Sequence, residues 1–206
     1  MDLFKGATTR FKNKVVGAFT SDSPSERKDD EILLQLWSRG VDCIDSKNLH
    51  ELNRLITSES SLVNYEGKGG DTLLHIAAGK GELEAAQLLV KHKADINHQN
   101  KDNRTPLIEA TCSQFTLVTK FLLHKGANVS LYSVNRSTAL YYVARRRDAE
   151  VKLVKSLVKH SRAYLDNVVN HIVSTSTPFM AILDFVQVPE VKQYLIDNGE
   201  SHSFFE

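Results

Sequence analysis

Apolar residues recur along the chain at helical spacing, in short segments that polar turns interrupt. Near the middle, Leu83, Ala86, Leu88 and Leu89 form an apolar face on a predicted helix. Gly81, just before this segment, suits a turn that reverses the chain after a preceding apolar helix. The pattern predicts a helix-turn-helix unit, and such a unit cannot bury both of its faces without a neighbour.

The unit is repeated. Four segments share one pattern: residues 72–77 (TLLHIA), 105–110 (TPLIEA), 138–143 (TALYYV) and 177–182 (TPFMAI). Their first residues lie 33, 33 and 39 positions apart. A second pattern follows the first two at a fixed distance, in residues 88–97 (LLVKHKADIN) and 121–129 (FLLHKGANV). In each unit the threonine is expected to cap a short helix.

This pattern resembles the ankyrin repeat, whose signature is T-P-L-H-x-A, followed by a helix that ends in L-L-x-x-G-A-D-x-N. Residues 68–100 match the signature almost throughout. The resemblance implies an all-α fold: a solenoid of stacked helix-turn-helix units with short β-hairpin connections. It also implies that the protein binds a macromolecular partner and is not an enzyme.

The matches fade toward both ends, as expected for the caps of a stack. We expect a basic extension and linker at residues 1–28 and a repeat domain at 29–203, with repeats at about 34–66, 67–99, 100–132, 133–171 and 172–203. Residues 31–38 are expected to form an additional capping helix, and residues 189–199 a final helix that Pro189 begins and Gly199 ends. The fourth repeat carries six extra residues, expected in a loop that either faces a partner or is a tolerated elongation.

The N-terminal extension combines basic residues with an apolar stripe that includes Phe4, Phe11 and Val15. Residues 1–19 are therefore expected either to contact an anionic membrane or a partner as an amphipathic helix, or to be disordered or packed on the stack. The glycines Gly6 and Gly17 weaken the helix.

Composition narrows the class of protein without naming a partner. The 206 residues are 41% hydrophobic and 25% charged, with a formal net charge of +1, which is typical of a soluble domain. The two cysteines, Cys43 and Cys112, predict neither a disulfide framework nor a zinc site. With no apolar run long enough for a membrane span or a signal peptide, we expect an intracellular protein, cytoplasmic rather than nuclear. A secreted microbial effector that acts inside a host cell would fit the same pattern.

No motif predicts catalysis, a cofactor or a metal. The glycine-rich residues 67–72 lack the order of a phosphate-binding loop and are better explained as a hairpin tip. His92, His124 and His160 fall one to a repeat, near predicted helix ends, and too far apart to share one ion. His75 occupies the histidine position of the T-P-L-H signature, where the resemblance implies that it joins neighbouring turns.

The resemblance implies that a partner lies along the hairpin tips and the exposed side of the first helix in each unit. Tip positions include Gly69, Val134 and Ser137, and Tyr132, Tyr141 and Tyr142 are candidates for aromatic contact. The expected partner-binding residues are Lys68, Asp71, Lys80, Lys101, Asp102, Arg104, Ser113, Asn135, Arg136, Arg145, Arg146 and Arg147. Most are basic, so we expect a monomer that acts as an adaptor, inhibitor or effector and binds an acidic segment of another protein.

Two other interpretations of the basic residues stay open. Residues 145–147 are also explained as a solvated helix end. A basic groove would also suit nucleic acid or an anionic membrane, although aromatic residues suited to base stacking are sparse there.

Overall fold

The computed structural model describes residues 24–144, 146–147, 150–168 and 188–199. The chain divides into two units, residues 1–35 and 36–206. Of the first unit, the structure describes only residues 24–35, which form the first part of helix α2 (Pro24–Asp45). The basic extension predicted at residues 1–19 lies outside the described residues. The following description therefore concerns the second unit.

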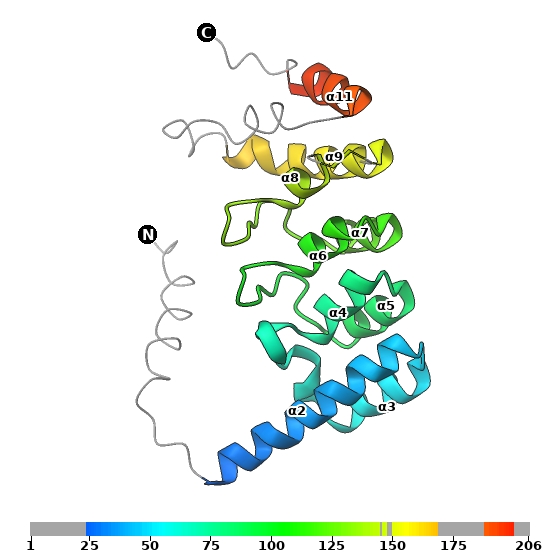
Figure 1. The fold of residues 1–206 in the computed structure, drawn as a ribbon, viewed down its shortest axis with the longest axis vertical. Coiled ribbons are helices and arrows are strands. Elements are labelled where there is room, and N and C mark those ends of the chain that lie inside the picture. Colours follow the sequence, from blue (N-terminus) through cyan, green and yellow to red (C-terminus); the bar gives the residue numbers. More distant parts are fainter. Residues whose placement is uncertain (1–23, 145, 148–149, 169–187, 200–206) are drawn as a thin grey trace. The chain divides into compact units, whose positions relative to one another are not determined.

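The helices described in the second unit follow one another in chain order, most of them in pairs (Figure 1). After the last part of α2 come α3 (Leu49–Ser58), α4 (Leu73–Lys80), α5 (Leu83–Lys91), α6 (Pro106–Cys112), α7 (Thr116–His124), α8 (Ala139–Ala144), α9 (Val151–Val168) and α11 (Pro189–Gly199). Short 3-10 helices at Ser60–Asn64 and Lys68–Gly70 connect α3 to α4. The all-α stack of helix-turn-helix units expected from the sequence is confirmed.

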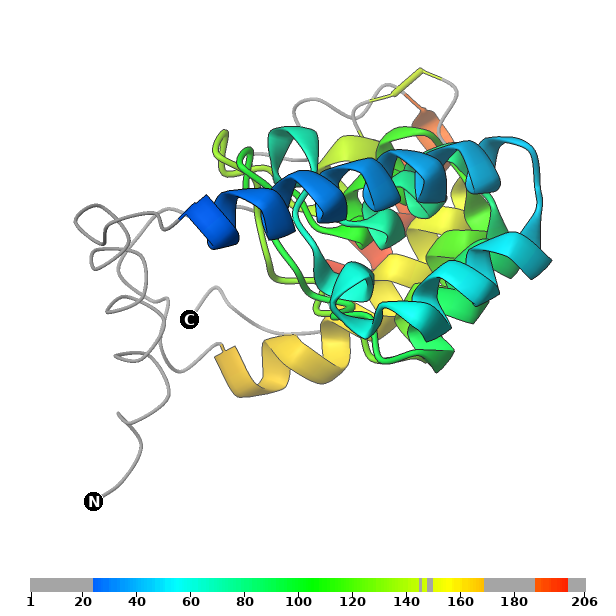
Figure 2. The ribbon, with the colours of Figure 1, turned by 90° about the horizontal axis from the view of Figure 1, so that it is seen from below.

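Each helix packs against its counterpart in the next pair, which makes two layers. The inner helices α4, α6 and α8 contact one another in that order, and the outer helices α3, α5, α7 and α9 do the same, with α11 on α9. The loops between pairs project on the same side of the inner layer in both ribbon views (Figures 1 and 2).

The core lies between these layers. Small residues let the inner helices approach closely, because Ala77 and Ala78 of α4, Ala110 of α6 and Ala144 of α8 are fully buried. Larger side chains fill the space behind them: Leu52, Leu73, Leu89, Leu107, Leu122 and Leu153 are each at most 1% exposed. Burying one such leucine contributes about 1.5–3 kcal/mol. Every pair therefore depends on its neighbours for much of its stability.

The threonine of the repeated pattern caps the inner helix. The hydroxyl oxygen of Thr105 accepts a hydrogen bond from the amide of Ile108 at 3.3 Å, and that of Thr138 accepts one from Tyr141 at 3.4 Å. Pro106 occupies the first turn, where a missing N–H costs nothing. The fourth copy, which begins at Thr177, lies outside the described residues.

Five helices end in one and the same backbone motif. After α4, the amide of Glu82 bonds to the carbonyl of Ala77 at 2.9 Å while Gly81 has a φ of 76°. The amide of Gly81 also bonds to the carbonyl of Ala78 at 3.3 Å, and these two hydrogen bonds with a left-handed residue make a Schellman motif. The left-handed residues at the ends of α2, α4, α5, α6 and α7 are Lys47, Gly81, Lys93, Gln114 and Gly126. Three of these five residues are not glycine, so their side chains strain the backbone.

Side-chain amides tie the outer loops of successive units together. The Oδ1 atom of Asn64 accepts a hydrogen bond from the amide of Asp95 at 2.7 Å. One repeat later, the Oδ1 atom of Asn97 accepts from the amide of Asn128 at 2.8 Å. Both partners advance by 33 residues, so the same bond recurs in register.

Two expectations about the ends of the stack differ from the structure. Residues 31–38 do not form a separate capping helix, because α2 runs without interruption from Pro24 to Asp45 and begins inside the expected linker. The extra residues of the fourth repeat were expected in a loop, but α9 extends to Val168 and is 18 residues long, twice the length of α5 or α7. Part of the insertion therefore lengthens an outer helix, while residues 169–187 lie outside the described residues. The final helix at Pro189–Gly199 is confirmed.

The repeated helix ends predict opposite effects for two substitutions. Gly81→Ala should lower the free energy of unfolding by about 1–2 kcal/mol, because alanine resists positive φ. Its Cβ would also lie 2.3 Å from the Phe115 ring, which must move. Gln114→Gly should raise the free energy of unfolding by about 0.5–1 kcal/mol, because it relieves strain in the same motif. Urea unfolding followed by circular dichroism measures both free energies, and changes of equal sign would contradict backbone strain at Gln114.

Candidate partner-binding surface

Three hairpins connect the helix pairs, at residues 67–71, 100–104 and 133–137, which we call the first, second and third hairpins. Each is closed by a hydrogen bond from the amide of its first residue to the carbonyl of its last, at 2.9, 3.0 and 3.1 Å respectively. A residue with positive φ recurs at the fourth position of each, namely Gly70, Asn103 and Arg136. The three loops therefore share this closing bond and one left-handed position, although the first hairpin has positive φ at Gly69 as well.

Backbone hydrogen bonds also join each hairpin to the next. The amide of Lys101 donates to the carbonyl of Gly69 at 2.9 Å, and the amide of Val134 donates to the carbonyl of Asp102 at 2.9 Å. Asn100 reinforces the first of these joints, because its side-chain amide donates to the carboxylate of Asp71 at 2.7 Å. The hairpins thus form a continuous edge, in which hydrogen bonds fix the backbone that carries the exposed side chains.

His75 links the first helix of one unit to the hairpin of the next. Its Nε2 atom lies 3.0 Å from the carbonyl oxygen of Arg104, which can only accept, so Nε2 carries the proton. Its Nδ1 atom then accepts from the amide of Thr72 at 3.2 Å and lies 2.9 Å from the Thr72 hydroxyl. The side chain joins neighbouring turns, as the resemblance implied.

Burial sets the protonation state of this histidine. His75 is 2% exposed, and desolvation lowers the pKa of its imidazole. The hydrogen bond to Arg104 and the nearby carboxylate of Asp71 act in the opposite direction, while the ring of His98 adds to the lowering. The His98 ring stands edge-on at 5.8 Å between centroids. The fold therefore favours the neutral ring.

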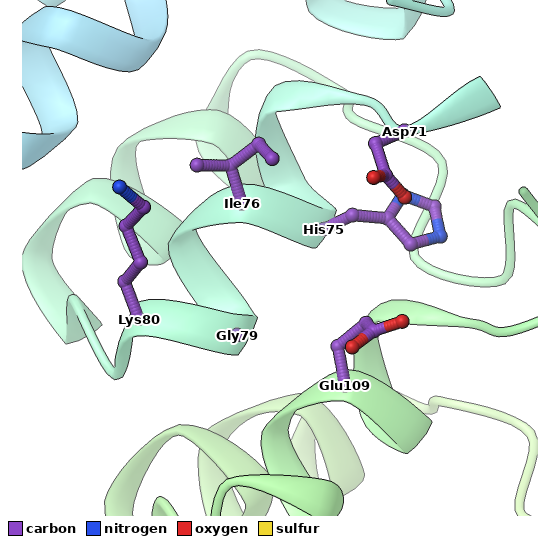
Figure 3. A pocket seen from close by; sticks show the side chains of 6 residues that line it. All are labelled: Asp71, His75, Ile76, Gly79, Lys80 and Glu109. Atoms are coloured by element: carbon purple, nitrogen blue, oxygen red, sulfur yellow. The ribbon is translucent and has the colours of Figure 1, made fainter. Parts of the chain in front are cut away.

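A shallow open hollow of about 240 Å³ lies between α4 and α6, next to the first hairpin (Figure 3). Its lining residues are Asp71, His75, Ile76, Gly79, Lys80 and Glu109. Burial raises the pKa of the Glu109 carboxyl, and Asp71 and Asp102 raise it further, while Arg104 opposes the shift. Sequence analysis did not single out Glu109, although its position on the exposed side of an inner helix was the available signal. The hollow is thus less basic than the sequence suggested.

Several cations of the expected groove are already engaged within the chain. Lys80 forms an ion pair with Asp45 of α2. Arg104 lies 3.5 Å from the carboxylate of Glu109, and its guanidinium stands 5.6 Å from the centre of the Tyr142 ring. Arg146 donates to the carbonyl of Cys112 at 3.0 Å, at the end of α6. Each of these three side chains already has a contact within the chain, which a partner would have to share or displace.

The other expected residues lie mostly on the hairpins. Lys68, Lys101 and Arg136 are exposed and come from the first, second and third hairpin in turn. None of these three has an ion-pair partner in the part of the chain that the structure describes. The remaining exposed residues of the set are Asp102, Ser113, Asn135 and Arg147, while Asp71 is half-buried. Arg145 lies outside the described residues.

Within the described ranges, the structure offers no group of three or more histidine, cysteine or acidic residues placed to hold a metal ion. Among the helices that the structure describes, none has both the length and the apolar character needed to cross a lipid bilayer.

Comparison with known proteins agrees with the repeat pattern. Residues 41–133 match a family model described as ankyrin repeats in three copies. The matched residues run from within α2 to the start of the third hairpin.

Curated relatives contain the same kind of repeat. The rat ankyrin repeat and SAM domain-containing protein 6 is 33% identical over 111 residues, which are 53% of this chain and 12% of that protein. The mouse B-cell lymphoma 3 protein homolog is 37% identical over 97 residues, 47% of this chain and 20% of that protein. The Caenorhabditis elegans E3 ubiquitin-protein ligase hecd-1 is 30% identical over 137 residues, 66% of this chain and 5% of that protein. The chain therefore spans a fifth or less of each of these relatives.

The buried histidine predicts a pH-dependent stability. The pKa of His75 in the folded chain lies below its value of about 6.5 in the unfolded chain. As the pH falls through about 6.5, the unfolded chain therefore takes up a proton that the folded chain does not, and the free energy of unfolding decreases. At pH 7.5, His75→Gln should lower the free energy of unfolding by about 1–3 kcal/mol. At pH 5.5, the difference in free energy of unfolding between wild type and variant, which we call the gap, should be smaller.

Urea unfolding at both pH values measures this gap. His124→Gln, at the exposed end of α7, is the control, and its smaller gap should not narrow with falling pH. A gap for His75→Gln that stays constant between the two pH values would contradict the neutral, bridging histidine.

Proposed function

Because this chain belongs to the ankyrin-repeat proteins, whose repeats generally mediate protein–protein interaction, we propose that it holds a segment of a partner protein along its three hairpins and inner helices. Repeats of this family are typically non-catalytic, which fits a role as an adaptor, inhibitor or effector. The proposed partner segment is acidic, and the proposed binding unit is a monomer in the cytoplasm.

The observation that carries the proposal is the row of three exposed cations, Lys68, Lys101 and Arg136, one on each hairpin. The hairpins are bonded to one another through their backbones, so the spacing of the three charges is largely set before a partner arrives. Preformed surfaces lose less conformational entropy on binding. An extended chain with carboxylates at intervals would meet these cations in turn and would be steered toward them.

The other expected residues have supporting roles in this proposal. Lys80, Arg104 and Arg146 keep the inner helices in place through their contacts within the chain, and a partner would meet them at the inner side of the row. Ser113 and Asn135 are exposed and offer hydrogen bonds. Arg145 and Arg147 extend the positive charge in sequence beyond α8.

Acidic side chains among the cations favour a protein segment over nucleic acid. Asp71, Asp102 and Glu109 stand on or beside the same hairpins, and they would repel a uniformly negative phosphate backbone. A peptide can alternate acidic, polar and basic residues and so match a mixed surface. The membrane interpretation of residues 1–19 rests on residues that the structure does not describe.

Reversing the charge row tests the proposal. The triple variant Lys68→Glu, Lys101→Glu and Arg136→Glu should lose the partners that the wild-type chain retains from a lysate of its own cells. For the strongest partner, the Kd should rise at least tenfold, and rising salt should weaken wild-type binding because the attraction is electrostatic. Affinity capture with mass spectrometry, followed by calorimetry on that partner, measures both effects.

The chain provides a matched control on its opposite layer. Lys91, Lys120 and Lys152 are exposed on the outer helices α5, α7 and α9, one on each of these three helices. Reversing these three residues to glutamate changes the net charge equally, and it should leave partner capture intact. Circular dichroism checks that both variants remain folded, since surface substitutions usually cost no more than about 0.5 kcal/mol each. Equal losses in both triple variants would show that only net charge matters, and the proposed row would be wrong.

A further inference from the structure

Two apolar side chains are exposed at the third hairpin: Val134 lies within it, and Tyr132 comes directly before it. Tyr132 and Val134 are 53% and 55% exposed, while Ser133 between them is 1% exposed. A single exposed apolar residue is ordinary, but these two lie two positions apart in one short loop, and we call them the apolar patch.

The other two hairpins place polar residues at these positions. One repeat earlier, 33 residues back, the counterparts of Tyr132 and Val134 are Gln99 and Lys101. Two repeats earlier they are Glu66 and Lys68. The second hairpin has the same closing bond and the same left-handed fourth position as the third, yet it carries polar residues here, so the fold does not require an apolar side chain at either position. The two apolar residues are therefore a specific property of the third hairpin.

Three interactions hold the backbone around Tyr132 and Val134 in place. Tyr132 pairs with Thr138 in an antiparallel bridge, and the amide of Val134 donates to the second hairpin at Asp102. The hydroxyl of Ser133 lies 3.0 Å from that of Tyr142 in α8, which anchors the loop to an inner helix. The patch thus needs little ordering on binding, which is a property of good docking sites.

Positive charge flanks the patch. Arg136 belongs to the same hairpin, and Lys101 lies next to Asp102, whose carbonyl accepts from Val134. Both cations are exposed, and neither has an ion-pair partner among the described residues. The Asp102 carboxylate opposes them, which leaves a net positive surrounding. Tyrosine is frequent among residues that dominate binding energy, because it offers a large apolar face with a polar end.

We propose that the third hairpin anchors an extended partner segment in which an apolar side chain packs on Tyr132 and Val134, next to carboxylates that meet Lys101 and Arg136. The proposal rests on the protein-binding function proposed above and goes further, because it names the anchoring point and the sequence character of the partner. Because the anchor is apolar, it would favour acidic segments that carry an apolar side chain over acidic segments that do not.

A displayed library of random 16-residue peptides, selected against the full chain, supplies the probe. Selected peptides should combine an aromatic or aliphatic residue with aspartate or glutamate within a few positions. Their Kd, measured by fluorescence anisotropy, should rise at least tenfold in the double variant Tyr132→Ser and Val134→Ser. The conservative pair Tyr132→Phe and Val134→Ile should bind within about twofold of wild type, because the apolar surface is kept.

Leu117→Ser is the matched control, since Leu117 is 69% exposed on the outer helix α7 and its loss should leave peptide binding unchanged. Peptides that lack carboxylates, or that bind the double serine variant as well as wild type, would overturn the proposal. Failure to select any peptide that binds below about 100 µM would also overturn it. So would concentration-dependent dimerisation that the double serine variant abolishes, because a second copy would then cover the patch.

The charge-row variant separates this proposal from the broader one. If Lys68→Glu, Lys101→Glu and Arg136→Glu together raise the Kd of the selected peptides while the double serine variant does not, the proposed charge row is supported and the proposed apolar anchor is wrong. If neither variant weakens them, both proposals fail.

Discussion

The structure depends on one constraint: a single pair of short helices exposes more apolar surface than it can cover. Each inner helix is therefore covered by the inner helices beside it, through buried alanines such as Ala77 and Ala110. Once two units are pressed together in this way, equivalent atoms recur every 33 residues, and the same hydrogen bonds form again. The bonds between hairpins and those between outer loops follow from that register. The proposed binding surface is thus a by-product of how the core is closed.

The parts of the fold that depend on residues close in sequence could be predicted. Thr105 and Thr138 identified helix starts because a cap acts within three residues, and Pro189 with Gly199 marked the last helix for the same reason. The ends of α2, α5 and α6 could not be located by this rule, because Lys47, Lys93 and Gln114 adopt the left-handed conformation that sequence rules assign to glycine. The length of α9 was also missed, since its extra residues keep helical character where a loop was expected.

The candidate site was harder to predict than the fold, because charge depends on contacts between distant residues. Lys80 pairs with Asp45, 35 positions away, and Arg146 bonds to the carbonyl of Cys112, 34 positions away. A count of lysines and arginines cannot reveal such pairings. Glu109 was missed for the opposite reason: it stands where the family signature allows any residue, so the pattern draws no attention to it. The three-dimensional arrangement leaves a narrower row of available cations than the sequence implied.

Contacts between nearest neighbours have a mechanical consequence. In the described stack, α3 contacts α5 and α7 contacts α9, but no contact of comparable extent joins α3 directly to α9. A disturbance at one end can therefore travel only through each intervening pair, and the outermost pairs have a neighbour on one side alone. Amide exchange should therefore be fastest in the terminal helices and slowest near α6. A pulling force should unfold the stack one helix pair at a time.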